Sequence, residues 1–242
     1  GTPSQFIISQ LVTIKAFNQV SDQSVTLTFT IITPILSFTY PESSYTLSKN
    51  ESFSVSPSVS GYEPSFSVVS GSLPSGLSLN SSSGIISGTP SQSVISSQSV
   101  TIKAFNEVSN RSFSLSFTVL TPISSFSYSQ SSYVLSKNSP FSISPTVNGD
   151  ELSFSIISGS LPIGLILNQS TGIISGSPSQ FVISQSVTIK AFNQVSDQSF
   201  PISFTVLTPI SSFSYPQTSY ILSAGVSFSV SPTISGDDLS FS

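Results

Sequence analysis

An internal repeat of 87 to 88 residues constrains this chain more than any other feature of its sequence. The segment Leu-Pro-Ser-Gly-Leu-Ser-Leu-Asn at residues 73–80 returns with two changes at residues 161–168. The tetrapeptide Lys-Ala-Phe-Asn begins at Lys15, Lys103 and Lys190, so successive copies are 88 and then 87 residues apart. A fixed period of this length is the size of a small domain, and it predicts a tandem array of folded modules.

Thr-Pro steps keep the same spacing and are expected to close each unit: Thr33-Pro34, Thr121-Pro122 and Thr208-Pro209. The chain would then hold two complete units at residues 35–122 and 123–209. Residues 1–34 would be the C-terminal part of a preceding unit, and residues 210–242 the N-terminal part of a further one. Either the array is longer, or a second molecule completes the split unit. The second explanation lacks any segment that matches residues 68–87.

The difference of one residue between the two periods lies between Pro90 and Lys103. Residues 91–98 are one longer than the matching residues 179–185. Because loops and bulges accept an extra residue at little cost, we expect the difference to fall in one of them.

Composition places the chain among folded, weakly charged proteins. Serine accounts for 66 of the 242 residues, and only 7% of residues are charged, against about 25% in an ordinary globular domain. A hydrophobic fraction of 37% with 19 Phe nevertheless argues against disorder, because disordered segments lack aromatic and β-branched residues. We therefore expect a folded chain with an apolar core, whose surface is kept soluble by serine hydroxyl groups in place of charged side chains.

Several partner classes are excluded at the outset. The chain has no Cys and no His, so neither a disulfide framework nor a thiolate metal site is expected. Its six Lys and Arg residues are scattered, which leaves no basic patch for nucleic acid. Apolar runs are too short to cross a bilayer as a helix, so no membrane span is expected in this segment.

Apolar residues alternate with serine over short segments. Phe53, Val55 and Val59 follow this pattern, and so does the run 113–119, Phe-Ser-Leu-Ser-Phe-Thr-Val. A period of two predicts strands with one apolar face and one hydroxyl face. About seven such strands occupy each unit, separated by turns. Since each apolar face needs a cover, two sheets must pack together as an antiparallel β-sandwich.

A longer motif, Leu-Pro-x-Gly-Leu-x-Leu-x4-Gly-x-Ile-x-Gly-x-Pro, spans residues 73–90 and 161–178 and precedes a Val-Thr-Ile-Lys-Ala-Phe strand. This motif resembles the Ig and cadherin-like tandem-repeat domain family of extracellular proteins. The resemblance implies an all-β chain of tandem Ig-like (cadherin-like) sandwiches at an extracellular or cell-surface location. True cadherins bind calcium through acidic clusters between domains, and these have no match at residues 33–34 or 121–122. The resemblance therefore implies no calcium.

No residues in the chain point to catalysis, a cofactor or a metal. Without His or Cys, a Ser nucleophile would need a Lys base, and Lys15, Lys103 and Lys190 are predicted to point outward among hydroxyls. Adjacent carboxylates occur at 150–151 and 237–238, in a predicted turn where we expect them to be solvated. The chain is not expected to be an enzyme.

Four asparagines have serine two positions later, which makes them acceptors for covalent N-linked glycans in a secreted protein: Asn50, Asn80, Asn110 and Asn168. Asn80 and Asn168 are 88 residues apart at the same predicted turn. The other two do not recur in this way, so the repeated pair is the stronger candidate.

Three phenylalanines, Phe17, Phe105 and Phe192, are out of phase with the inward residues of their strands. They are either contact anchors for a partner or are buried under a loop. The outward serine rows carry no charge to guard them, and such strand faces invite association.

These features favour a non-enzymatic extracellular structural protein. Its tandem units would assemble with copies of themselves, head to tail or laterally, into a filament, stalk or surface layer. An alternative is a cell-surface adhesin or carbohydrate-binding repeat module whose ligand docks on Phe105 and Tyr62. A spacer within a larger enzyme is a third possibility.

Overall fold

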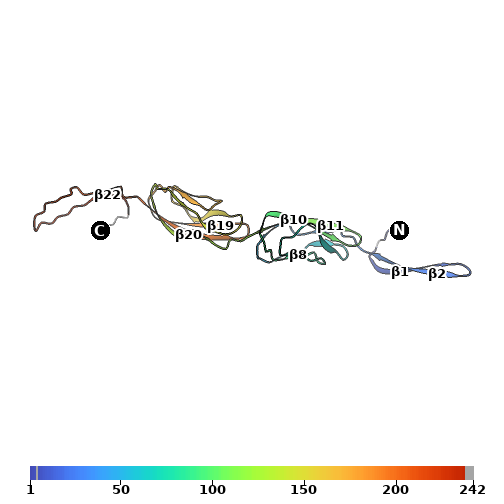
Figure 1. The fold of residues 1–242 in the computed structure, drawn as a ribbon. Helices are drawn as coiled ribbons and strands as arrows, with labels where there is room; N and C mark the ends of the chain where they lie inside the picture. Colours follow the sequence, from blue (N-terminus) through green and yellow to red (C-terminus); the bar gives the residue numbers. More distant parts are fainter. Residues whose placement is uncertain (4, 238–242) are drawn as a thin grey trace. The chain divides into compact units, whose positions relative to one another are not determined.

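The computed structural model of the chain describes residues 1–3 and 5–237. The chain divides into two compact units, Gly1–Thr121 and Pro122–Ser242. Every regular element of the described residues is a β-strand. Each unit combines one complete sandwich with one two-stranded piece (Figure 1).

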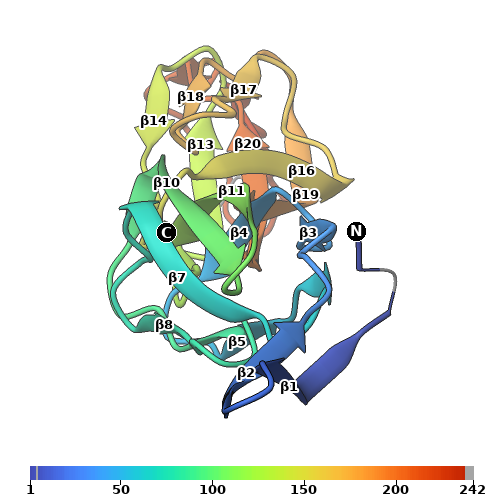
Figure 2. The same cartoon turned by 90° about the vertical axis from the view of Figure 1, so that its right-hand side faces the viewer.

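Nine short strands build the sandwich of the first unit: β3 (Ser37–Thr39), β4 (Ser44–Ser48), β5 (Phe53–Val55), β6 (Ser58–Ser60), β7 (Ser65–Gly71), β8 (Leu77–Leu79), β9 (Ile86–Gly88), β10 (Val94–Phe105) and β11 (Asn110–Leu120). A four-stranded sheet has the order β4-β11-β10-β7, and a three-stranded sheet has the order β5-β9-β8. Strands β3 and β6 form a separate pair. Figure 2 shows β7, β10, β11 and β4 side by side.

The second unit repeats this arrangement with β12 (Phe126–Ser127), β13 (Ser132–Ser136), β14 (Phe141–Ile143), β15 (Thr146–Val147), β16 (Ser153–Gly159), β17 (Leu165–Leu167), β18 (Ile174–Gly176), β19 (Val182–Phe192) and β20 (Asp197–Leu207). Its sheets have the orders β13-β20-β19-β16, β14-β18-β17 and β12-β15. The expectation of tandem all-β Ig-like sandwiches is confirmed in both repeats.

Alternation of side chains sets the core, as the sequence predicted. In β10, Val100, Ile102 and Ala104 are buried, whereas the intervening Thr101 and Lys103 are only partly covered. Burying each Val, Ile or Leu stabilises the fold by about 1.5–3 kcal/mol, so the repeated inward rows supply most of the stability of a sandwich without disulfides. In β11 the inward row includes Leu115, Phe117 and Val119, none of them more than 1% exposed.

Two of the predicted strands are each split in the structure, which is why nine elements replace the expected seven. The segment 53–60 becomes β5 and β6, on either side of Pro57. Proline has no N–H to donate to a ladder, and here it marks the point where the chain leaves one sheet for another. β5 pairs with β9, whereas β6 pairs with β3. The segment 38–47 also alternates, and Pro41 interrupts it in the sequence; it forms β3 and β4 on either side of that break.

The sandwich is antiparallel except at one pair in each unit. β4 runs parallel to β11, with Tyr45 opposite Phe117, and β13 runs parallel to β20. The crossing between β3 and β4 explains this pair. After β3, which pairs with β6, the chain crosses to the edge of the four-stranded sheet. It joins that edge as β4, running in the same direction as β11.

The extra residue of the longer repeat lies in a β-bulge, as predicted. Val94 pairs with Val119 and Gln98 with Phe117, so three residues of β10 stand unpaired between these pairs. In the second unit only two residues separate Val182 from Gln185. The register of the following strand is therefore the same in both units.

The two-stranded pieces are β1 (Ile7–Phe17) with β2 (Asp22–Ile31), and β21 (Ser212–Ser214) with β22 (Thr233–Ser235). The first matches β10 and β11 of the complete sandwich, but its apolar row is open. Ile14 is 51% exposed, whereas its counterpart Ile102 is 0% exposed. Phe213 is likewise exposed, although its counterpart Phe38 is buried.

Candidate functional site

The turn between β10 and β11 binds the chain segment that leads into the first sandwich. Asn106 Nδ2 donates to the carbonyl oxygens of Thr33 and Tyr62, each at 3.0 Å. Asn106 Oδ1 accepts from the amides of Val108 and Ser109 at 3.2 and 3.1 Å. One side chain thus closes its own turn and ties it to the Thr33-Pro34 junction.

Ser109 extends this contact to the first residue of the sandwich. Its Oγ donates to Asn106 Oδ1 at 3.1 Å and accepts from the Ile35 amide at 2.6 Å. Since Ile35 is fully buried, this bond satisfies an amide that water cannot reach. We call the pair Asn106 and Ser109 the junction clasp.

The second unit repeats the clasp. Asn193 Nδ2 donates to the carbonyl oxygen of Asp150 at 2.9 Å, and Ser196 Oγ accepts from the Ile123 amide at 2.7 Å. Asn18 of the hairpin closes the same turn, accepting from the Ser21 amide at 2.9 Å.

Sequence reasoning noted the repeated Lys-Ala-Phe-Asn but gave its asparagine no role. The signal was present in the wider pattern Asn-x-Val-Ser, at 18–21, 106–109 and 193–196. Asn and Ser that recur together at three-residue spacing favour a side-chain-closed turn. What the pattern could not give is the distant partner at the junction.

A cavity of about 540 Å³ lies beside the clasp in the first unit. It is lined by Thr30, Ile32, Tyr62, Glu63, Ser65, Phe105, Asn106 and Glu107. The structure thus brings together Tyr62 and Phe105, the two aromatics that the sequence suggested for ligand docking. Both rings are half-buried, whereas the Glu63 and Glu107 side chains are exposed. We call this cavity the junction cleft.

Interactions on either side of the junction cleft hold its two rings. The ring of Phe6 packs on Tyr62 with centroids 4.9 Å apart, and a hydrogen bond to the Glu63 carboxylate raises the pKa of Tyr62. Lys103 Nζ lies 4.8 Å from the centroid of Phe105, a cation–π contact.

The other two out-of-phase phenylalanines lie in different surroundings. Phe17 is 79% exposed at the end of β1. Phe192 is half-buried, with Lys190 Nζ 5.8 Å from its ring centroid. The same sequence position is therefore open in the hairpin and partly covered in the complete sandwiches.

All four candidate glycan acceptors, Asn50, Asn80, Asn110 and Asn168, are exposed. Asn80 and Asn168 occupy the turns β8–β9 and β17–β18. Asn80 Oδ1 accepts from the amides of Ser82 and Ser83 at 3.0 and 2.9 Å, and Asn168 makes the matching pair of bonds. Asn50 has a left-handed backbone with φ of 66°, and Asn110 begins β11. These bonds hold the Asn80 and Asn168 side chains by their oxygen, and the Nδ2 atom that would carry a sugar takes no part in them.

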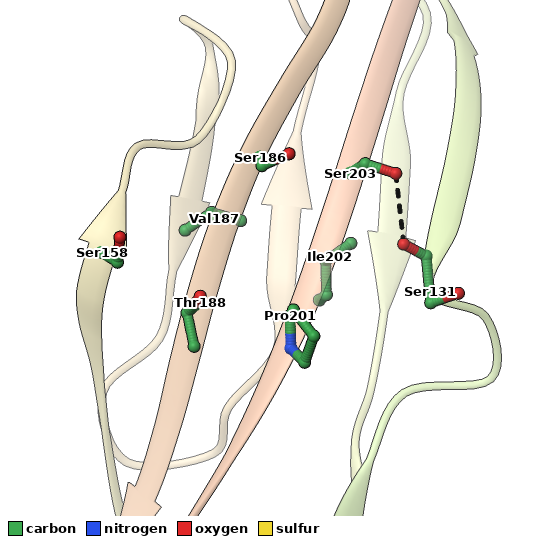
Figure 3. A pocket seen from close by; sticks show the side chains of 8 residues that line it. All are labelled: Ser131, Ser158, Ser186, Val187, Thr188, Pro201, Ile202 and Ser203. Atoms are coloured by element: carbon green, nitrogen blue, oxygen red, sulfur yellow. Dashed lines mark hydrogen bonds between the residues drawn. The ribbon is translucent and has the colours of Figure 1, made fainter.

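The outer face of the four-stranded sheet in the second unit carries a shallow groove of about 220 Å³ (Figure 3). Serine, threonine and apolar side chains line it: Ser131, Ser158, Ser186, Val187, Thr188, Pro201, Ile202 and Ser203. Ser203 Oγ donates to the carbonyl oxygen of Ser131 at 3.3 Å, the bond drawn in Figure 3. None of the lining residues is a base, so this groove offers hydroxyl groups for contact rather than an activated nucleophile.

Two of the lysines on the strands form local ion pairs. Lys15 contacts Asp22, and Lys190 contacts Asp197, its near neighbour across each hairpin. Hydrogen bonds from the Thr208 side chain and from the Thr208 amide, the latter at 2.8 Å, lower the pKa of Asp237. Its neighbour in the sequence, Asp238, lies outside the described residues.

The described part of the chain offers neither a metal-binding cluster nor a membrane-spanning helix. No group of three His, Cys, Asp or Glu side chains in residues 1–3 and 5–237 is placed to hold a metal ion. The same residues contain no helix that is long and apolar enough to cross a membrane.

Comparisons with known proteins agree with this architecture. A family model described as "Putative Ig domain" matches residues 10–122 and 118–209. A structure of titin domains I67–I69, an E-to-A variant, aligns with a TM-score of 0.52 at 14% identity over 82% of this chain and 74% of that chain. Extracellular domains 3–5 of Drosophila OTK align with a TM-score of 0.52 at 11% identity, over 82% and 71%. No curated protein matches the sequence.

Proposed function

Since the chain belongs to the "Putative Ig domain" family, we propose that it is a non-enzymatic extracellular structural protein. Its tandem Ig-like units would build a filament, stalk or surface layer from copies of the chain. The OTK domains that share its fold are described as extracellular, which supports that location. Its surface of hydroxyl groups suits a role in contact rather than in chemistry.

The observation that carries this proposal is the repeated junction clasp. Asn106 ties the turn β10–β11 to Thr33, and Ser109 binds the amide of Ile35. A proline follows Thr33 and restricts the backbone there. A junction held by proline and by side-chain bonds on both sides favours a regular array over freely jointed domains.

Association of copies is supported by the outer sheet faces. In the segments 112–118 and 199–205 the side chains that point away from the core are Ser, Thr and Pro, and none of them is charged. Natural monomers usually guard such surfaces with charged side chains. Because the two units are near-copies, one unit offers the next almost the same surface, which suits head-to-tail or lateral growth.

Electron microscopy of the purified chain tests this role. Rods or fibres with a repeat close to one domain length are expected. The variant Asn106→Ala/Asn193→Ala, with both clasps cut, should lose the regular repeat, whereas Asn18→Ala should keep it. Flexible monomers in the unmodified protein would contradict the proposal.

We further propose that Asn80 and Asn168 carry N-linked glycans when a glycosylating cell secretes the protein. Each lies on an exposed turn, and each is held by its Oδ1 atom, so the Nδ2 atom can accept a sugar. Intact mass of secreted material should fall by one glycan for Asn80→Gln and for Asn168→Gln separately. Unchanged mass in both variants would contradict the assignment.

Residues 1–34 and 210–242 each resemble only part of a complete unit. Residues 1–34 match the end of the complete unit 35–122, and residues 210–242 match its beginning. We propose that both belong to further Ig-like units, because their open apolar rows repeat the residues that form the core elsewhere. Limited proteolysis should cleave within them before it cleaves residues 35–122 or 123–209.

A second function, a cell-surface adhesin or carbohydrate-binding module, is favoured by one observation. Tyr62 and Phe105 line a common cleft together with two carboxylates. Partly exposed rings beside convergent polar groups are typical of small-molecule sites. Binding of saccharides to the purified chain tests this function.

A further inference from the structure

The residues of the junction cleft differ between repeats that are otherwise close copies. Tyr62 corresponds to Asp150 in the next unit and to Asp237 in the one after. Asp237 uses its carboxylate to accept the Thr208 amide at 2.8 Å. The backbone amide of Tyr62 donates to the carbonyl oxygen of Thr33 at 3.2 Å, as the Asp237 amide does to Thr208. The Tyr62 side chain does not copy the carboxylate bond; it packs on Phe6 and lines the cleft. The ring therefore contributes something other than the bond that an aspartate makes here.

A second exchange changes another residue that lines the cleft. Glu107 stands where the other repeats have glutamine, at Gln19 and Gln194. The first unit thus combines two half-buried rings with the carboxylates of Glu63 and Glu107 around one cavity. Its volume of about 540 Å³ lies within the roughly 300–1,000 Å³ of small-molecule sites.

From this lining we infer that the junction cleft binds a neutral saccharide of one or two pyranose rings. This inference rests on the second function proposed above and names its site and ligand class. The apolar C–H face of a sugar ring packs on Tyr62 and Phe105, while its hydroxyl groups donate to the carboxylates of Glu63 and Glu107. Hydrogen bonds to ionised acceptors are about twice as strong as those between neutral groups, so the carboxylates orient the ring.

Charge selects among ligands of this size. The two carboxylates repel acidic saccharides and other anions. An organic cation meets a different obstacle, because the ammonium group of Lys103 already lies over Phe105, 4.8 Å from its centroid. A second cation at this ring would be repelled by the first. A neutral sugar ring donates hydroxyl groups to the carboxylates and packs on the aromatic rings, and it is repelled neither by the carboxylates nor by Lys103.

The experiment is a saccharide-binding measurement on the full chain, by isothermal titration or saturation-transfer NMR. The panel holds neutral mono- and disaccharides, uronic acids and alkylammonium ions. Binding of at least one neutral saccharide is expected, and Tyr62→Asp should weaken it ten-fold or more. Glu107→Gln should weaken it several-fold, and the remote Glu42→Gln should leave it unchanged. Asp and Gln occupy these positions in the second unit, so both cleft variants are expected to fold.

Three results would overturn the inference: no neutral saccharide binds, Tyr62→Asp binds as well as the unmodified chain, or binding is confined to charged ligands. Electron microscopy of the same variants keeps this outcome separate from the structural role. A chain that forms regular rods but binds no saccharide disproves the cleft alone. One that binds through Tyr62 without forming rods disproves the array alone.

Discussion

The phenolic oxygen of Tyr40 donates a 2.6 Å hydrogen bond to the carbonyl oxygen of Gly84, 44 residues later in the chain. Tyr128 and Gly172 make the same bond at 2.5 Å in the next unit. Both tyrosines are 4% exposed, and the rings also pack on Phe38 and Phe126. The bond therefore joins the end of the first strand to the turn before β9 across the core of each sandwich.

Removing this hydroxyl group should destabilise one unit and spare the other. Tyr40→Phe leaves the buried Gly84 carbonyl without its partner, which costs about 1–3 kcal/mol in the free energy of unfolding. Amide hydrogen exchange followed by mass spectrometry checks this, because peptides from residues 94–120 and 182–207 differ in mass. Faster exchange is expected in the first segment only. Tyr215→Phe, at the exposed counterpart of Tyr40, is the control and should change neither.

A matched pair of isoleucines tests the origin of the stability. Ile102→Ala removes a fully buried side chain and should cost about 2–5 kcal/mol, through lost burial and the cavity left behind. Ile14→Ala makes the same change at the equivalent position of the hairpin, which is half exposed, and should cost at most about 0.5 kcal/mol. Urea unfolding monitored by circular dichroism measures both. Equal losses would mean that Ile14 is covered in solution.

Alkaline pH should destabilise both sandwiches through the buried hydroxyl groups of Tyr40 and Tyr128. Burial raises the pKa of Tyr40 and Tyr128 well above the ordinary value near 10. A raised folded pKa means that stability is fully present below pH 10 and is lost as pH rises beyond it, since the unfolded chain releases these protons first. The urea midpoint of the unmodified chain should therefore fall steeply above pH 10. In the variant Tyr40→Phe/Tyr128→Phe, the urea midpoint should be lower at neutral pH but should fall less steeply above pH 10. If the midpoint falls equally steeply in both proteins, the two tyrosines are not the cause.

The junction clasp can be dissected by two changes at one residue. Asn106→Asp keeps the oxygen that closes the turn but loses the donor to Thr33 and Tyr62, whereas Asn106→Ala loses both. We expect the Ile35 amide to exchange faster in both variants, and most in the alanine variant, at a cost of about 1–3 kcal/mol. NMR-detected exchange at Ile35 measures this directly. Asn18→Ala should leave the Ile35 amide unaffected.

Much of this architecture could be predicted because it depends on local rules. Alternation placed Ile102 and Phe117 inward, and the unequal periods located the bulge after Val94. The division of segment 53–60 was not predicted, although Pro57 stands at the break. Alternation continues through the proline, so periodicity alone cannot reveal that the chain changes sheets there.

The junction contacts were the least accessible to sequence reasoning. The bond from Asn106 to Thr33 spans 73 residues, and no local pattern reports a partner at that distance. The grouping of Tyr62 with Phe105 was suggested by residue type alone. The carboxylates beside them could be recognised only once the turns β6–β7 and β10–β11 were seen to meet.

The bulge between Val94 and Gln98 lets the number of residues in a repeat vary without changing the sandwich. An added or deleted residue there is absorbed before the inward row of β10 begins, so every later side chain keeps its neighbours. Duplicated genes that gain or lose a codon at this point would still encode working modules. The same insertion or deletion later in β10 would turn its inward apolar residues toward solvent, and selection would remove it.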